Sequence, residues 1–248
     1  MANTTGKKIK DAAIIGGCAS LIYLTIGDIS YRLSLSRGGL NSKLITDMVA
    51  KSAEKKPKNE YKEKLDSMID DGADWFMHQD TEKIIIEKKH RQSLYADLIR
   101  PDKSSNVYII CIHGYTSSPA NMGIYAKKYH ELGYNVLLPS LRGHGDSEQD
   151  FITMGWNDRL DVIEWINYIA ERHPESKIIL HGVSMGAATT MMATGEKLPE
   201  NVKAAIEDCG YTSAWDILGI RLTKSIKLPR FPFLYLSLIH ISEPTRLQ

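Results

Sequence analysis

The sequence predicts an α/β fold with a doubly wound, mostly parallel sheet, and three observations indicate it. Short apolar runs alternate with helical patterns along residues 81–235. One run, Val107–Ile112, is almost uninterrupted, as in a central strand buried on both faces. Another run, residues 177–181, leads through Gly182-Val183-Ser184-Met185-Gly186 into a stretch of small residues. That order fits a strand, a sharp turn and a helix in succession.

The N-terminal region, residues 1–40, is predicted to be a membrane anchor or signal-anchor. Lys7, Lys8 and Lys10 precede an uncharged, apolar stretch at residues 12–27. Lysines beside such a stretch tend to stay in the cytoplasm, so we expect a single-pass protein of the cell membrane with its main domain outside. The stretch is somewhat shorter than the roughly 20 residues of a spanning helix. A buried helix, a cleaved signal, lipidation at Cys18 and a cytoplasmic location therefore stay open.

Residues 41–80 are predicted to be a helical spacer in two pieces that divide near Pro57. Alternating charges over residues 51–64 indicate a solvated face. Four apolar side chains are expected to pack on the main domain: Leu65, Met68, Ile69 and Phe76.

The sheet itself is expected to begin with two antiparallel strands, residues 83–87 and 93–99, joined by a polar turn. Four parallel strands should follow, at residues 107–112, 135–138, 177–180 and 202–207. Helices are predicted at residues 119–132, from Pro119 to the terminator Gly133, and at residues 156–172. Apolar side chains recur at helical spacing in the two helices and are expected to face the core: Met122, Tyr125, Ala126 and Tyr129 in the first, and Leu160, Ile163, Ile166 and Ala170 in the second.

Ser184 is the candidate nucleophile. A serine on such a turn is held in a strained backbone conformation with its hydroxyl above the sheet, and glycines two positions away let the backbone pass closely. Met185 would supply a backbone N–H at the start of the next helix, where negative charge is favoured. Tyr115, in the loop after the strand at 107–112, is the candidate for a second oxyanion donor.

Three motifs carry a resemblance to a known family: His113-Gly114-Tyr115, Arg142-Gly143-His144-Gly145-Asp146-Ser147, and the glycine-flanked Ser184 segment. In this order they resemble the α/β-hydrolase superfamily, and within it the serine aminopeptidase S33 or lysophospholipase-like branch, over roughly residues 82–220. The resemblance implies a serine hydrolase that acts by acyl transfer on a carboxylic ester, such as a lipid or acyl ester. A peptidase or amidase of the same fold, or a non-catalytic membrane-tethered remnant, is the alternative.

The remaining members of a catalytic triad are harder to place. In this fold an acid and then a histidine follow the nucleophile on later strands. Asp208, at the end of the strand 202–207, is a candidate acid, although the resemblance gives this position a structural role. His113 and His144 are predicted to shape loops.

No catalytic histidine is expected in this chain. His240 lies in residues 236–248, which resemble an in-frame translation of a sequencing adapter. We therefore expect a hydrolase core at residues 81–235 that is incomplete on its C-terminal side, with a cap beginning near residue 214. The chain as written is expected to be poorly active.

Composition excludes several other classes of protein. The net charge of +1, with 43% hydrophobic and 25% charged residues, gives no basis for nucleic-acid binding. Cys18, Cys111 and Cys209 are too widely spaced to indicate a disulfide framework or a metal cluster. A phosphate-binding glycine loop and a His-Glu-x-x-His motif are both absent from the sequence, so neither a cofactor nor a metal is expected. A small-molecule ester and, through the N-terminal segment, a membrane are the expected partners.

Overall fold

The computed structural model describes residues 60–88, 92–221 and 223–224, together with Thr25, Arg32 and residues 35–37. The chain divides into two units. Residues 40–212 form the larger one, and residues 1–39 and 213–248 form the other. Helix α7 (Ala214–Arg221) belongs to the second unit. Most of the predicted anchor at 12–27, the first piece of the spacer and the tail at 236–248 lie outside the described residues.

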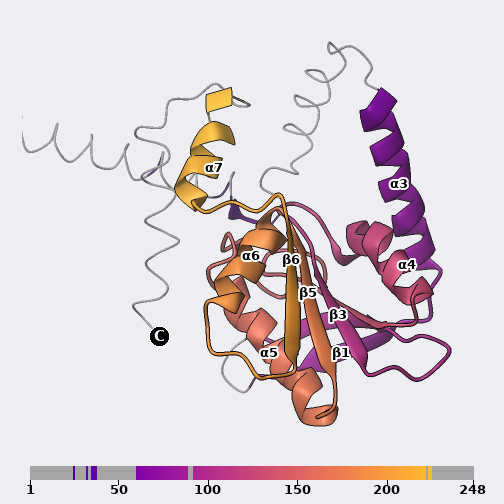
Figure 1. The fold of residues 1–248 in the computed structure, drawn as a ribbon. Coiled ribbons are helices and arrows are strands. Elements are labelled where there is room, and N and C mark those ends of the chain that lie inside the picture. Colours follow the sequence, from indigo (N-terminus) through magenta and orange to yellow (C-terminus); the bar gives the residue numbers. More distant parts are fainter. Residues whose placement is uncertain are drawn as a thin grey trace, which may run out of the picture. The chain divides into compact units, whose positions relative to one another are not determined.

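A six-stranded sheet forms the centre of the larger unit, in the order β1-β2-β4-β3-β5-β6 (Figure 1). β1 pairs antiparallel with β2, and β2 pairs antiparallel with β4, whereas β4, β3, β5 and β6 run parallel. The mostly parallel sheet with antiparallel first strands is therefore confirmed. The strands are β1 (Glu82–Ile86), β2 (Leu94–Ile99), β3 (Val107–Ile112), β4 (Asn135–Pro139), β5 (Lys177–Val183) and β6 (Val202–Asp208).

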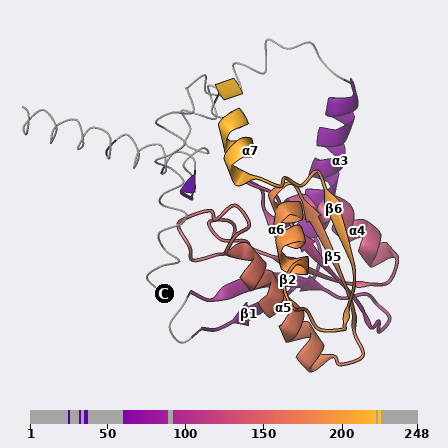
Figure 2. The same cartoon turned by 60° about the vertical axis from the view of Figure 1, so that its left-hand side comes forward.

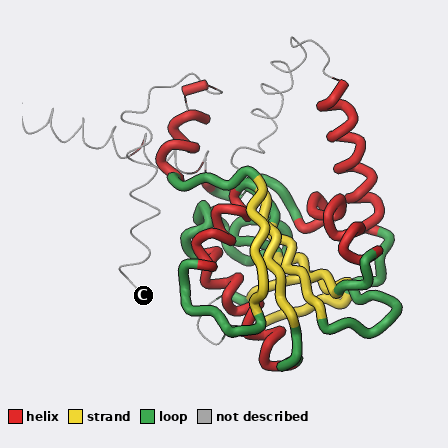
Figure 3. The backbone as a smooth tube through the Cα atoms, viewed as in Figure 1, coloured by secondary structure: helices red, strands yellow, loops and turns green. Residues whose placement is uncertain are grey.

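Helices cover both faces of this sheet, as Figures 2 and 3 show. On one face lie α3 (Glu60–Met77), the 3₁₀ helix η1 (Pro119–Met122) and α4 (Gly123–Glu131). Their buried side chains Phe76, Met122 and Ala126 pack with Ile109 and other strand residues in one apolar cluster. On the other face lie α5 (Asp158–Arg172) and α6 (Met185–Thr194). The sheet is thus buried between two helical layers, which explains why β3 is apolar along its length.

The helix predicted at 119–132 is present, but its first turn is the 3₁₀ helix η1, which begins at Pro119. Proline suits this position because its missing N–H would have no partner in the first turn. As predicted, Met122 and Ala126 are buried in the core, and Tyr125 and Tyr129 pack against it.

The predicted core face of the second helix is partly wrong. Leu160 is 41% exposed, whereas Val162, Trp165 and Ile169 are buried. The helix also begins at Asp158 rather than at residue 156. The buried face is therefore shifted from the predicted one, although Ile166 belongs to both. Met154 and Gly155, just before the helix, have positive φ angles of 51° and 91°.

The spacer prediction is wrong for two of its apolar contacts. Phe76 is buried as expected, but Leu65 and Met68 are 39% and 47% exposed. Only the C-terminal half of α3 reaches η1 and α4, where Gly72 is also buried. None of the helices in the described part of the chain combines the length and apolar character that a membrane span needs.

Candidate active site

Ser184 lies on the turn between β5 and α6, with φ 55° and ψ −110°. This left-handed conformation is unfavourable for a residue that carries a Cβ, so the surrounding structure must hold it. Two backbone hydrogen bonds do so: the Ser184 N–H donates to the carbonyl of Asp208 at 2.8 Å, and the Ser184 carbonyl accepts from Ala188 at 3.0 Å. The strand, turn and helix predicted from the sequence are therefore present around this serine.

The two glycines that flank Ser184 are required by close backbone contacts. A Cβ on Gly182 would overlap the carbonyl of Gly186, and a Cβ on Gly186 would overlap the carbonyl of Ile112. The start of α6 therefore packs directly against the end of β3. Side chains at either position would push the turn away from the sheet.

The loop after β3 lies beside Ser184. A Cβ built on Gly114 would stand 3.4 Å from the Ser184 Cβ and 4.0 Å from its Oγ. Ser184 is also partly accessible to solvent. Its hydroxyl is consequently next to the loop of residues 113–116 rather than packed inside the protein.

Tyr115 and Met185 directly follow Gly114 and Ser184 in the chain. Tyr115 is partly exposed in the loop after β3, directly after Gly114. Met185 is the first residue of α6, and an amide at that position has no acceptor one turn earlier in its own helix. Their roles as oxyanion donors stay predictions.

His113 and His144 tie the loop after β3 to the loop after β4. His113 Nε2 accepts from the Leu141 N–H at 3.2 Å, and His144 Nε2 accepts from the Thr116 N–H at 3.0 Å. The Nδ1 atoms lie 2.9 Å from the Gly114 carbonyl and 2.8 Å from the Arg142 carbonyl. Because Nε2 accepts, Nδ1 carries the proton in both rings. Burial lowers the pKa of His113 from 6.5 to about 3. Both rings are therefore neutral and connect the two loops by hydrogen bonds, consistent with the loop-shaping role predicted for them.

Asp208 is the last residue of β6 and contributes to the turn through its carbonyl. Its Oδ2 accepts from the Tyr125 hydroxyl at 3.0 Å. The neighbouring His181 ring packs edge-on against Tyr125, and its Nδ1 lies 2.9 Å from the Tyr129 hydroxyl. Burial lowers the pKa of His181, and the Asp208 charge opposes that shift. The Asp208 carboxylate is thus hydrogen-bonded toward α4, and its assignment as a triad acid stays a prediction.

Arg142 anchors the loop after β4 to the first turns of α5. Its guanidinium donates two hydrogen bonds to the Asp161 carboxylate, at 2.6 and 2.9 Å. The backbone N–H of Arg142 donates to Asp158 Oδ1 at 3.1 Å. Asp158 also accepts from Thr153 and Gly155. Sequence reasoning singled out Arg142 within its motif but missed both aspartates, whose only signal is their place in the first turn of a helix.

No histidine in the described part of the chain is hydrogen-bonded to Ser184 Oγ. His240 lies outside it. Within the same residues, no group of three or more histidine, cysteine, aspartate or glutamate side chains is arranged to hold a metal ion.

This protein has the α/β-hydrolase fold. Residues 107–226 match the family model described as alpha/beta hydrolase fold. The Pyrococcus furiosus esterase PF2001 superposes with a TM-score of 0.53 and 27% identity, over 68% of this chain and 63% of that one.

Two relatives are similar in sequence. The thermostable monoacylglycerol lipase of Bacillus sp. (strain H-257) is 31% identical over 90 residues, which is 34% of this chain and 34% of the relative. The uncharacterized protein YqkD of Bacillus subtilis (strain 168) is 29% identical over 137 residues, 55% of this chain and 45% of the relative. The chain therefore spans less than half the length of both.

Proposed function

We propose that this protein is a serine hydrolase that acts by acyl transfer on a carboxylic ester, with Ser184 as the nucleophile. The observation that carries the proposal is the backbone of Ser184, held at φ 55° between β5 and α6 with its Oγ next to Gly114. A strained serine at the carboxyl edge of a parallel sheet is where this fold presents a nucleophile. The esterase and lipase among the similar proteins support an ester as the substrate.

In the proposed reaction, Ser184 Oγ bonds to the ester carbonyl carbon while its proton passes to a histidine base. The electron pair of the carbonyl moves onto its oxygen, which the amides of Tyr115 and Met185 would stabilise. Each such donor is typically worth about 2.7–4 kcal/mol in the transition state. The alcohol then leaves with the proton, and water releases the acid by the reverse sequence of steps. The base would come from outside the described residues.

In this scheme Asp208 could act as the triad acid or as a residue that positions the serine turn. We propose that it acts mainly as a positioning residue, because its carbonyl holds the Ser184 N–H and its carboxylate holds Tyr125. Among hydrolases, we propose the serine aminopeptidase S33 or lysophospholipase-like branch and a lipid or acyl ester as the substrate. A peptidase of the same branch would share the nucleophile and differ in its leaving group.

Fluorophosphonate labelling, read by intact mass and peptide mapping, tests the nucleophile. It should be run on the 248-residue chain and on the product of the complete genomic reading frame. We expect the label on Ser184 of the reading-frame product and no label in the Ser184→Ala variant. The control is Ser176→Ala, which should label normally because Ser176 is buried and lies at the opposite end of β5. Slow labelling is expected for the 248-residue chain, since no described histidine reaches Ser184. Labelling that persists in Ser184→Ala, or none in either protein, would refute the proposal.

The ester assignment needs a separate measurement. Hydrolysis of p-nitrophenyl butyrate by the reading-frame product should exceed that of butyryl p-nitroanilide, the matching amide. A preference for the anilide would instead assign the protein to the peptidases or amidases.

We further propose that residues 12–27 attach the protein to the cell membrane. This rests on the apolar sequence after three lysines and lies outside the described residues, apart from Thr25. Fractionation of the expressed full chain tests it. Recovery in the membrane pellet after alkaline carbonate washing is expected, and recovery in the supernatant would contradict it.

A further inference from the structure

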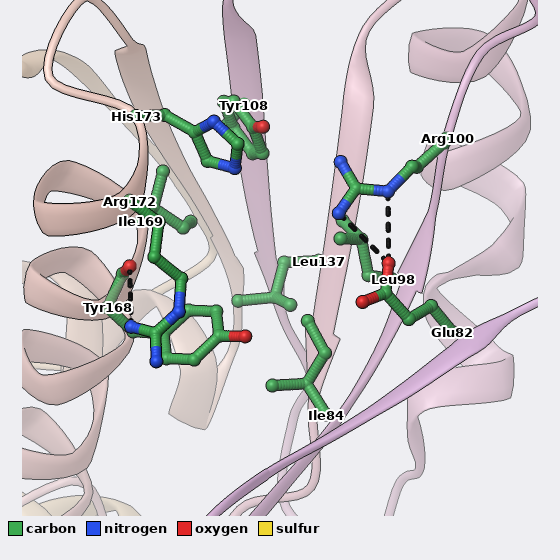
Figure 4. Close-up of a pocket in the computed structure, with 10 residues that line it drawn as sticks. All are labelled: Glu82, Ile84, Leu98, Arg100, Tyr108, Leu137, Tyr168, Ile169, Arg172 and His173. Atoms are coloured by element: carbon green, nitrogen blue, oxygen red, sulfur yellow. Dashed lines mark hydrogen bonds and ion pairs between the residues drawn. The ribbon is translucent and has the colours of Figure 1, made fainter.

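We propose that a pocket at the amino ends of the parallel strands binds a small carboxylate with an apolar body. The pocket has a volume of about 210 Å³ and lies between the C-terminal end of α5 and strands β1, β2, β3 and β4 (Figure 4). It is separate from the candidate active site: Tyr108, which lines it, is at the start of β3, whereas Ser184 follows the end of β5.

The floor of this pocket is apolar. Ile84, Leu98 and Leu137 come from three neighbouring strands and are at most 6% exposed. Figure 4 shows Ile84 and Leu137 between the charged side chains of the two walls. Because these side chains have little surface left in contact with solvent, the floor offers a ligand apolar contacts rather than a large area to remove from water.

One wall of the pocket carries an arginine, Arg172, that pairs with no carboxylate among the residues that the structure describes. The Arg172 guanidinium carbon lies 3.7 Å from the centre of the Tyr168 ring, and its Nη1 donates to the Tyr168 carbonyl at 3.4 Å. Among the described residues, no ion pair includes Arg172. The aromatic ring holds the guanidinium in place while its remaining donors stay available.

The opposite wall adds a second arginine whose charge is partly compensated. Arg100 makes an ion pair with Glu82 at 2.9 Å. The pocket lining thus holds two guanidinium groups and one carboxylate, which is paired with Arg100, so the walls carry an excess positive charge. The His173 ring stacks on Tyr108 with centroids 5.1 Å apart and closes the upper side.

These features together select the class of ligand. A guanidinium presents parallel N–H donors that match a carboxylate, and the apolar floor matches a hydrocarbon body. The volume is below the roughly 300–1,000 Å³ of sites for drug-sized ligands. A short-chain carboxylate such as hexanoate satisfies the charge, the polarity and the size.

Calorimetric titration of the full chain with hexanoate and with its neutral isostere hexanamide tests the proposal. We expect saturable binding of hexanoate and none of hexanamide at the same concentrations. Replacing Arg172→Gln should weaken hexanoate binding about five- to tenfold, because a charge-assisted contact is lost at a partly exposed site. Arg159→Gln is the matched control: it is also an α5 arginine stacked on an aromatic ring, Trp156, but it does not line the pocket.

A variant that binds hexanoate more tightly provides a second test, because misfolding would weaken binding rather than strengthen it. Glu82→Gln frees Arg100 from its competing carboxylate, so it should tighten hexanoate binding about two- to fivefold. Nuclear Overhauser effects from the ligand methylenes to the rings of Tyr108 or Tyr168 would locate the site. Equal affinities in wild type and Arg172→Gln, equal binding of the acid and the amide, or no binding at millimolar hexanoate would each overturn the proposal.

Discussion

His113 combines two properties at the scale of a single residue: it is fully buried, and both of its ring nitrogens are used by backbone groups. Protonation of Nε2 would break the hydrogen bond from Leu141 and place a charge in the interior. The same ring is hydrogen-bonded to the carbonyl of Gly114, a residue that lies next to Ser184, so the state of this histidine is linked to the shape of the candidate site.

His113 is predicted to make the fold sensitive to acid. Its pKa in the folded protein, about 3, is below the ordinary 6.5 of the unfolded chain, so the unfolded state binds more protons. The stabilisation is present above pH 6.5 and is lost as the pH falls from 6.5 toward 3. Between pH 7 and pH 5 the free energy of unfolding should fall by about 2 kcal/mol because of this one group.

Urea unfolding of wild type and His113→Asn at pH 7, 6 and 5 measures this contribution. Asn cannot titrate, so the variant should lose about 2 kcal/mol less than wild type over that interval, whatever its stability at pH 7. An unchanged pH dependence would show that His113 is not held neutral in the folded protein.

At the scale of secondary-structure elements, α3 joins the domain through a close crossing of two glycines. A Cβ on Gly72 would overlap the backbone of Ile124, and a Cβ on Gly123 would overlap the carbonyl of Gly72. The helices approach here more closely than any side chain allows. Phe76, one turn later, then reaches the core cluster.

Gly72→Ala should therefore reverse the usual effect of alanine in a helix. In the absence of the crossing, alanine would stabilise an internal helix position by about 1 kcal/mol. Here we expect a loss of about 1–3 kcal/mol from overpacking, measured by urea unfolding. Gly195→Ala is the control, because Gly195 ends α6 with φ −76° and its nearest neighbour would be at an ordinary 3.4 Å. A stabilised Gly72→Ala variant would show that α3 and α4 are not in close contact at Gly72.

The loop after β4 is tied to α5 by the partly buried pair of Arg142 and Asp161, whose side chains are 23% and 12% exposed. Asp161→Asn removes the charge and leaves the guanidinium without its partner, which should cost about 3 kcal/mol of unfolding free energy. Glu196→Gln, which breaks the pair of Arg159 with a carboxylate that is 43% exposed, should cost far less in the same thermal or urea unfolding measurement. Similar losses in both variants would show that the Arg142–Asp161 pair contributes no more to stability than the Arg159–Glu196 pair.

At the scale of the whole molecule, local patterns predicted most of the sheet and the serine turn. The strand at Val107–Ile112 was identified because it is continuously apolar, and the turn because glycines flank Ser184 at a fixed spacing. Both signals lie within a few residues along the chain. Each also reflects a requirement of the backbone itself, burial on both faces for the strand and close passage for the turn.

Features that depend on contacts between distant segments could not be predicted in the same way. The pairing of Arg142 with Asp161 joins the loop after β4 to α5, across a segment in which Met154 and Gly155 have positive φ angles. Leu160 is exposed although its spacing matched a core face. Periodicity predicts that a helix has an apolar face but not which way that face turns.

The burial of the sheet is uneven across its width, and this predicts where the molecule is most sensitive to mutation. Ile110 in β3 is 0% exposed, whereas Ile206 in β6, at the edge of the described sheet, is 42% exposed.

Ile110→Ala should cost about 2–5 kcal/mol of unfolding free energy, since it removes buried methyl groups and leaves a cavity. Ile206→Ala changes the same atoms in a strand of the same sheet, so the loss of strand propensity is shared by the two variants. It should therefore cost less than about 1 kcal/mol in a matched urea titration. Equal losses would show that β6 is covered in the folded protein in solution, and the core would then extend across the full width of the sheet.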